Sequence, residues 1–321
     1  MRAAWCDRLG DASVVEVRDV PEPTAGPGQA LVRVRAASVN FPDVLMIAGR
    51  YQVRVAPPFV PGTELAGEVV SAPDGSVPVG TRVTATVGCG AFAEFAAVDV
   101  GDLRPLPDGL DFVAGAAFRV IYSTAYHSLV TVGEARSGQV VAVLGAAGGV
   151  GLATVDVAHR LGLRVIAAAS SAARLDACRA HGADETVDYS VQPLKDRLKA
   201  LAPGGVDVVV DPVGGELAEQ ALRATGWGGR FVTVGYASGT IPRIPLNLVL
   251  LKGVQIRGFE MRGLGAHRPE ALSACEETLT RLVADGLRPH VDATYGLDDV
   301  RAALSHVADR RVIGKVVVDV G

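Results

Sequence analysis

A cluster of glycines in the middle of the chain could bind the phosphates of a nucleotide. Residues 145–151 are Gly-Ala-Ala-Gly-Gly-Val-Gly and follow the apolar run 140–144. Glycine lets the backbone turn sharply and approach a phosphate closely, and the free amides at the start of the next helix attract the anion. The alternative is that these glycines serve only tight packing. A strand before the cluster, a helix after it and a second strand at the usual distance favour a dinucleotide site.

The end of the next apolar run, residues 165–169, distinguishes NAD from NADP. Enzymes that use NAD usually carry Asp or Glu there, where it binds the ribose 2′-hydroxyl. This chain has no acid at that point and continues with Ser170, Ser171 and Arg174. Two hydroxyls and a guanidinium suit a 2′-phosphate, and Tyr189 could add another hydroxyl. Arg174 could instead be an ordinary helix residue and Tyr189 a packing aromatic, but the missing acid favours NADPH as the cofactor.

The elements that must position these residues change character near residue 122. Before it, alternating segments such as 13–18 and 30–35, separated by Pro and Gly turns, are typical of a small β-rich barrel. After it, short apolar strands alternate with helices, which predicts an α/β domain with a doubly wound parallel sheet. The expected strands are 139–144, 164–169, 206–210 and 230–234, and the expected helices are 149–161, 172–181 and 216–224. Helices at 271–284 and 298–308 and a strand at 315–320 follow, and we expect them to return to the first domain.

Composition excludes several classes of protein. The 321 residues suggest about two domains. With 49% hydrophobic and 21% charged residues the chain is not mainly disordered, and its net charge of −4 argues against a dedicated nucleic-acid binder. The four cysteines are widely spaced, which indicates a reducing cytoplasm. The uncharged segment 137–155 is close to the length of a membrane span, but its glycines favour a strand, a turn and a buried helix.

Seven motifs, taken in order, carry a family resemblance. They lie at residues 38–43 (Ser-Val-Asn-Phe-Pro-Asp), 48–51 (Ala-Gly-Arg-Tyr), 61–64 (Pro-Gly-Thr-Glu), 146–151, 182–184 (Gly-Ala-Asp), 211–215 (Asp-Pro-Val-Gly-Gly) and 235–239 (Gly-Tyr-Ala-Ser-Gly). The chain resembles the zinc-independent NADPH:quinone oxidoreductases, the zeta-crystallin-like branch of the medium-chain dehydrogenase/reductase superfamily. The likeness covers essentially the whole chain.

The resemblance implies two domains. A GroES-like β-rich barrel domain would comprise residues 1–121, with 260–321 returning to it, and a Rossmann domain that binds NADPH would comprise residues 122–259. It also implies a homodimer joined through the edge of the Rossmann sheet, with residues 253–258 as the local candidate, because an edge strand that pairs with its symmetry mate satisfies its open hydrogen bonds.

The resemblance also bears on zinc. Zinc-dependent relatives carry a cysteine where this chain has Asn40, a histidine where it has Thr63, and a third ligand near Val120. None of these three residues supplies a thiolate, imidazole or carboxylate, so we expect no metal site. Alcohol oxidation needs a Lewis acid or a positioned base, whereas a quinone is already electrophilic and its reduced anion can take a proton from water.

By resemblance, Asn40 and Asp43 lie beside the nicotinamide and Tyr51 lines the acceptor pocket. Asn40 and Asp43 could instead bond the backbone at a helix start, and Tyr51 could be a packing aromatic. The resemblance places further cofactor contacts at Thr124, His127, Gly148, Gly149, Val150, Tyr236 and Ser238, with Phe259, Gly314 and Lys315 as weaker candidates. His127 could equally be a core histidine.

Three functions remain open at this point. The first is hydride transfer from NADPH to a quinone or similar conjugated carbonyl. The second is reduction of a 2-enoyl thioester, with Tyr51 as the proton donor. The third is a non-catalytic, crystallin-like NADPH-binding protein. The polar residues kept on the acceptor side argue against the third.

Overall fold

The computed structural model describes residues 1–321 and divides them into two compact units. The first contains Met1–Val120 and Arg288–Gly321, and the second contains Ile121–Leu287. The chain thus returns to the first unit at Arg288, in place of the expected return at residue 260. The reason is that α9 (Met261–His267) and α10 (Pro269–Ala284) pack on each other, and the guanidinium of Arg160 in the second unit donates to the carbonyl of Asp285 at 3.3 Å.

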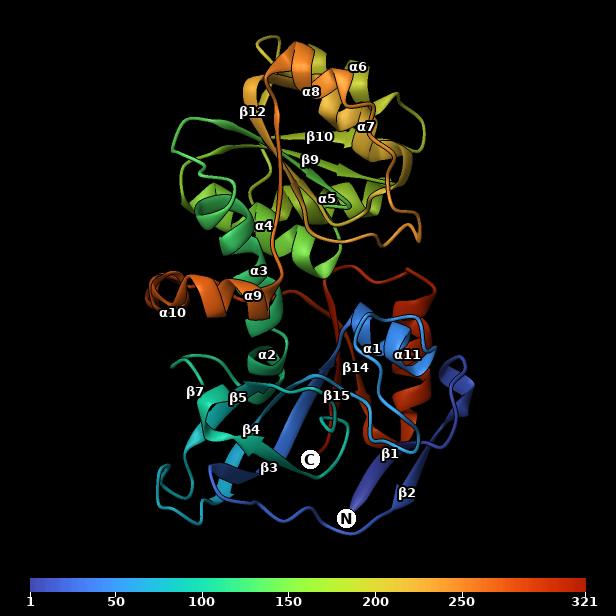
Figure 1. The fold of residues 1–321 in the computed structure, drawn as a ribbon, viewed down its shortest axis with the longest axis vertical. Coiled ribbons are helices and arrows are strands. Elements are labelled where there is room, and N and C mark those ends of the chain that lie inside the picture. The colour runs from blue at the N-terminus through green and yellow to red at the C-terminus, as the bar shows by residue number, and fades with distance from the viewer. The chain divides into compact units, whose positions relative to one another are not determined.

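The first unit is built on a seven-stranded, mostly antiparallel sheet. Its strands are β3 (Gln29–Val39), β4 (Glu64–Ser71), β5 (Arg82–Thr86), β6 (Phe95–Asp99), β7 (Leu103–Pro105), β14 (Val291–Gly296) and β15 (Lys315–Asp319). The order is β14-β15-β3-β4-β5-β7, with β6 also paired to β3. The N-terminal β3 and the C-terminal β15 therefore lie side by side although they are far apart in the sequence (Figure 1).

Strand register in this sheet sets the positions of several polar residues. Val39 of β3 pairs with Val316 of β15, and Ala37 of β3 pairs with Leu65 of β4. These pairings place the ends of the three strands together. Around them the core is built from small and branched residues, and α11 (Val300–Ala308) buries Val300 and Leu304 against it. Two short helices, α1 (Phe41–Ile47) and α2 (Phe112–Ala116), complete the unit.

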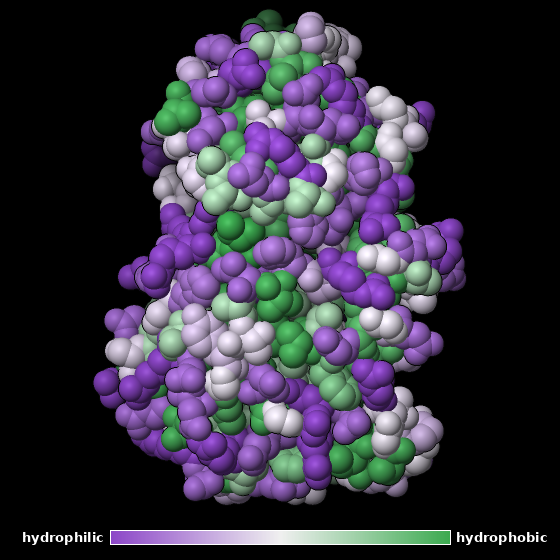
Figure 2. Space-filling model, turned by 180° about the vertical axis from the view of Figure 1, so that it is seen from behind, coloured by the Kyte–Doolittle hydropathy of each residue, from purple (hydrophilic) through white to green (hydrophobic).

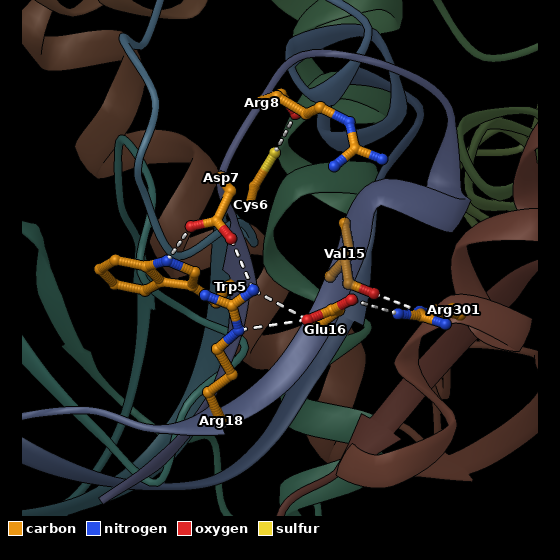
Figure 3. Close-up of polar contacts among 8 residues, drawn as sticks. All are labelled: Trp5, Cys6, Asp7, Arg8, Val15, Glu16, Arg18 and Arg301. Carbon is orange, nitrogen blue, oxygen red and sulfur yellow. Dashed lines mark hydrogen bonds and ion pairs between the residues drawn. The ribbon is translucent and has the colours of Figure 1, made fainter.

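A two-stranded sheet of β1 (Arg2–Cys6) and β2 (Val15–Asp19) is tied to α11 by charged groups. Figure 3 shows Arg301 of α11 donating to the carbonyl of Val15 and facing Glu16. The Arg301 guanidinium lies 3.4 Å from the Glu16 carboxylate. Glu16 in turn pairs with Arg18 at 2.8 Å. The side chains of Glu16, Arg18 and Arg301 are about half exposed, so these ion pairs add little to stability and mainly fix the orientation of the strands.

The second unit is a six-stranded parallel sheet with helices, as the sequence predicts. Its strands are β8 (Val140–Leu144), β9 (Arg164–Ala169), β10 (Glu185–Asp188), β11 (Val206–Asp211), β12 (Thr225–Thr233) and β13 (Gln255–Gly258). Its helices include α3 (Arg119–Tyr126), which enters from the first unit, α4 (Gly149–Arg160), α5 (Ala172–Ala180), α6 (Leu194–Leu201), α7 (Gly215–Ala224) and α8 (Asn247–Lys252). The order β10-β9-β8-β11-β12-β13 reverses direction between β8 and β11. In open α/β sheets, ligands bind at the carboxyl ends of the strands beside such a reversal.

No helix is both long enough and apolar enough to cross a membrane. The uncharged segment 137–155 forms β8, the glycine turn and the first half of α4, which confirms the expectation of a strand, a turn and a buried helix. On the face of the molecule drawn in Figure 2, hydrophobic residues occur in small groups among hydrophilic ones.

Candidate functional site

The glycine turn after β8 is shaped by close backbone contact. Gly145 has a positive φ of 55°, and Gly148 caps α4 with an extended backbone. A side chain at Gly151 would place its Cβ 2.3 Å from the carbonyl oxygen of Gly145, so the first turn of α4 packs directly on the preceding loop. The first amides of a helix have no acceptor within the helix, and here they belong to residues 149–151. The turn therefore has the geometry expected of a pyrophosphate site.

Four predicted residues meet at the carboxyl ends of β9 and β10. Ser170 and Ser171 follow β9, and Ser171 caps α5, whose first turn carries Arg174. The amide of Tyr189 donates to the carbonyl of Ala169 at 3.1 Å, which brings the tyrosine beside these residues. Burial raises the pKa of the Tyr189 phenol, and a hydrogen bond with Ser170 and the nearby Arg174 charge oppose that rise.

The loops after β11 and β12 lie on the other side of the reversal. The carboxylate of Asp211 accepts from the amides of Val213 and Gly214, both at 2.8 Å, and thereby shapes the turn into α7. Ser238 donates its amide to the carbonyl of Val213 at 2.9 Å, so the loop that carries Tyr236 and Ser238 covers this turn. Tyr236 is 41% exposed. The second carboxylate oxygen of Asp211 is buried without a partner, and burial raises the pKa of this group.

Thr124 and His127 lie where α3 passes into a π-helical turn, a feature frequent at functional sites. His127 is fully buried, with Nδ1 2.8 Å from the hydroxyl of Thr131 and its ring edge-on to Phe259. Burial lowers the pKa of His127 to about 4, so the ring is neutral at pH 7. This environment is that of a core histidine, although Nε2 is buried without a partner.

In the first unit, Asn40 and Asp43 begin α1 and are bonded to each other. The backbone N–H of Asn40 donates to Oδ2 of Asp43 at 2.7 Å, and the hydroxyl of Thr63 donates to Oδ1 at 2.8 Å. Asp43 is fully buried, which raises its pKa to about 7, and the two hydrogen bonds hold that rise in check. The helix-start alternative therefore describes Asp43 correctly, and this carboxyl can exchange a proton near neutral pH.

Two further residues belong to this cluster, and the sequence alone does not link either of them to Asn40. Glu64 accepts from the Asn40 side-chain amide at 3.2 Å and from the Ser38 hydroxyl at 2.6 Å. Lys315 donates to Oδ1 of Asn40 at 2.7 Å and to the carbonyl of Val39 at 3.2 Å. The resemblance makes Lys315 a weaker cofactor candidate, and the structure places it, buried, in this cluster. No local signal could have linked it to Asn40, because the two lie 275 residues apart.

Tyr51 is half-buried in the turn that follows α1. A cavity of about 190 Å³ borders the segments on either side of it. Its lining residues are Leu9, Met46, Gly49, Val53, Arg54 and Val55. The lining is mostly apolar with one guanidinium, that of Arg54.

The residues at the zinc-ligand positions of zinc-dependent relatives do not fit zinc. The side chain of Asn40 is engaged by Lys315 and Glu64, and the hydroxyl of Thr63 donates to Asp43. Val120 contributes only its amide, which donates to Glu64 at 2.7 Å. No three Cys, His, Asp or Glu side chains are grouped as metal ligands need to be.

Comparisons with known proteins cover nearly the whole chain. Residues 26–108 match the alcohol dehydrogenase GroES-like domain, and residues 149–277 match a family described as zinc-binding dehydrogenase. A quinone oxidoreductase-like protein 2 homolog from Nematostella vectensis is 37% identical over 99% of this chain and 88% of its own. A quinone oxidoreductase from Pseudomonas aeruginosa is 33% identical over 96% of both chains.

A solved structure shows the same fold. The quinone oxidoreductase from Thermus thermophilus, also solved in complex with NADPH, has a TM-score of 0.87 and 36% identity, and the match covers all of both chains. The expected GroES-like and Rossmann architecture is thus confirmed. The chain belongs to the medium-chain dehydrogenase/reductase superfamily, among its quinone oxidoreductase-like members.

Proposed function

We propose that the chain is an NADPH-dependent oxidoreductase that reduces a quinone or similar conjugated carbonyl without zinc. The observation that carries this proposal is the environment of Asn40. An amide stands where a zinc ligand would, and its oxygen and one of its N–H groups are engaged by Lys315 and Glu64. The amide nitrogen carries two hydrogens, so one remains as a donor for an acceptor oxygen.

The cofactor site is proposed from residues of the second unit. The amides at Gly148, Gly149 and Val150 suit the pyrophosphate, and the group formed by Ser170, Ser171, Arg174 and Tyr189 suits a 2′-phosphate. Thr124, Tyr236 and Ser238 would complete it on the nicotinamide side, and the buried His127 would support Thr124 from within the core. The NADPH complex of the Thermus relative supports this assignment.

The proposed reaction requires little proton transfer by protein side chains. The bound cofactor supplies a hydride, and the quinone with one further proton becomes a hydroquinone. Asn40 would donate a hydrogen bond to the oxygen on which negative charge develops, and water would deliver the proton. Asp43, which is fully buried, would hold the start of α1 that carries Asn40. Holding donor and acceptor in contact then supplies much of the rate enhancement.

The direct test is NADPH oxidation with benzoquinones, naphthoquinones, enals and crotonyl thioester as acceptors, with NADH in parallel. We expect turnover with quinones and a preference for NADPH. Turnover with crotonyl thioester alone would replace this proposal by enoyl reduction. Tight NADPH binding without turnover on any acceptor would instead support the non-catalytic alternative.

A variant of Tyr51 distinguishes quinone reduction from the enoyl-thioester alternative, in which this tyrosine is the proton donor; Tyr51 is half-buried, between residues that line the cavity. Tyr51→Phe removes only the hydroxyl. If quinone reduction is the function, we expect kcat with quinones to fall by no more than about threefold, since no side-chain proton donor is essential. If Tyr51 is the proton donor of an enoyl reductase, crotonyl reduction should be abolished.

Tyr295→Phe is the matched control for this experiment. The Tyr295 hydroxyl lies 3.2 Å from Nδ1 of His306, outside the proposed site, and its loss should leave both activities unchanged. Steady-state kinetics with both acceptors measures the difference. A loss of quinone turnover in Tyr51→Phe of more than about tenfold would show that the hydroxyl takes part in quinone reduction.

We also propose a homodimer joined through β13, the edge strand of the parallel sheet. Large apolar residues are exposed on β12, at the start of α8 and along it, and on β13: Trp227, Leu246, Leu250, Leu251 and Ile256. A second copy that pairs with this edge would cover them and satisfy the open backbone groups of β13.

The dimer is tested by Leu250→Asp, because the Leu250 side chain is 80% exposed and a charge there opposes burial. Light scattering should give about twice the 33.1 kDa chain mass for the wild type and a monomer for the variant. Val191→Asp is the control, since Val191 is 76% exposed beside β10 at the opposite edge of the sheet. A wild-type mass near that of one chain would contradict the proposal.

A further inference from the structure

A buried lysine stands at the centre of the polar cluster around Asn40. Lys315 is 4% exposed and opens β15 directly after Gly314, whose positive φ of 78° turns the chain into the sheet. Its amide donates to the carbonyl of His290 at 3.0 Å, which holds this turn in place. Since Val39 pairs with Val316, the lysine necessarily lies beside Asn40.

The chemistry of its partners fixes the orientation of the Asn40 amide. An ammonium group can only donate, so the Asn40 atom 2.7 Å from the Lys315 nitrogen must be the oxygen. A carboxylate accepts, so the Asn40 atom 3.2 Å from the Glu64 oxygen must be the nitrogen. Flipping the amide would break both hydrogen bonds and place like partial charges together.

Glu64 is itself held firmly. One carboxylate oxygen accepts from the Val120 amide at 2.7 Å, and the other accepts from the Ser38 hydroxyl at 2.6 Å. Lys315 lies 3.6 Å from this second oxygen, so the buried charge of Glu64 has an opposite charge beside it. The cluster is therefore a rigid frame with Asn40 between a cation and an anion.

We propose that Lys315 and Glu64 are positioning residues that orient the Asn40 amide so that its second N–H is held for the acceptor oxygen. The proposal rests on the proposed function, because that function supplies the acceptor. The pair acts through Asn40 and needs no contact with the substrate.

A double-mutant cycle tests the proposal. Lys315→Met keeps the aliphatic part of the side chain and removes its ammonium group, and we expect kcat with a benzoquinone to fall about tenfold while the Kd for NADPH changes by less than about twofold. In an Asn40→Ala background the same change should alter kcat by less than about twofold. Lys195→Met, on the surface of α6, is the control and should have no effect in either background.

Lys315→Met leaves Glu64 buried without its counter-charge, which can destabilise the fold. The paired variant E64Q/K315M removes both charges together while keeping both side chains similar in size. It is expected to fold and to show the same loss of kcat, again absent when Asn40 is alanine. Equal losses with and without Asn40 would show that the pair is merely structural and would overturn the proposal, as would an unchanged kcat.

A second measurement does not depend on turnover. The side-chain amide of Asn40 gives one ¹H–¹⁵N pair, identified by its disappearance in Asn40→Ala. In E64Q/K315M this pair should shift and its protons should exchange faster with water. If the wild type reduces no acceptor, the proposed function fails, and the NMR result still decides whether the pair orients Asn40. An unchanged signal would overturn the proposal by itself.

Discussion

Replacing Gly151 by alanine is expected to destabilise the second unit by about 3 kcal/mol or more and to weaken NADPH binding at least about 100-fold. The new Cβ would lie 2.3 Å from the Gly145 oxygen and 2.7 Å from two backbone atoms of Ala146. These are main-chain atoms with no freedom to rotate away, so the glycine turn must separate from α4. That movement displaces the amides proposed to bind the pyrophosphate.

Urea unfolding and NADPH fluorescence measure the two effects. Gly204→Ala is the matched control, because nothing lies within 4 Å of a Cβ at that position and the residue is remote from the turn. Its stability should change little. Full NADPH affinity in Gly151→Ala would show that the turn does not bind the cofactor, and unchanged stability would show that the loop accommodates the methyl group.

The parallel sheet could be predicted from the sequence because its strands are continuous apolar runs. The expected strand 164–169 coincides with β9, and 139–144 differs from β8 by one residue. The start of β12 could not be predicted in the same way. Residues 225–229 contain three glycines, which locally favour a turn, yet Thr225 pairs with Val206 and extends the strand. Tertiary pairing there overrides local preference.

The candidate site also has a part that could be predicted from the sequence and a part that could not. The glycine turn and the group around Arg174 follow directly from short motifs, because residues near one another in sequence also meet at one edge of the sheet. The frame around Asn40 does not. Its lysine comes from the last strand of the chain, and only the pairing of β15 with β3 brings the two together. Motifs defined by short spacings cannot predict a contact between residues so far apart in the sequence.

Arg174→Ala is expected to lower kcat/KM for NADPH about 100-fold and to leave that for NADH within about threefold. The Arg174 charge acts on the Tyr189 hydroxyl, which is bonded to Ser170, so these groups form one polar cluster at the end of β9. Two charge-assisted hydrogen bonds from arginine to a 2′-phosphate account for a loss of this size. NADH has no such phosphate, so removing the arginine should hardly change kcat/KM for NADH.

Arg179→Ala separates this specific effect from a general loss of positive charge. Arg179 lies on the same helix, but its guanidinium is exposed and bonds to Asp176 and to the Thr186 hydroxyl at 2.7 Å. Arg179→Ala should leave kcat/KM for NADPH and for NADH within about twofold of the wild-type values, because a screened surface charge acts weakly at this range. Dissociation constants measured by fluorescence make the comparison independent of the acceptor. Equal losses of affinity for NADPH and NADH in Arg174→Ala would show that Arg174 contacts a part of the cofactor other than the 2′-phosphate. Faster wild-type turnover with NADH would contradict the assignment of NADPH, because the hydroxyls and guanidinium at the end of β9 would then have no phosphate to bind.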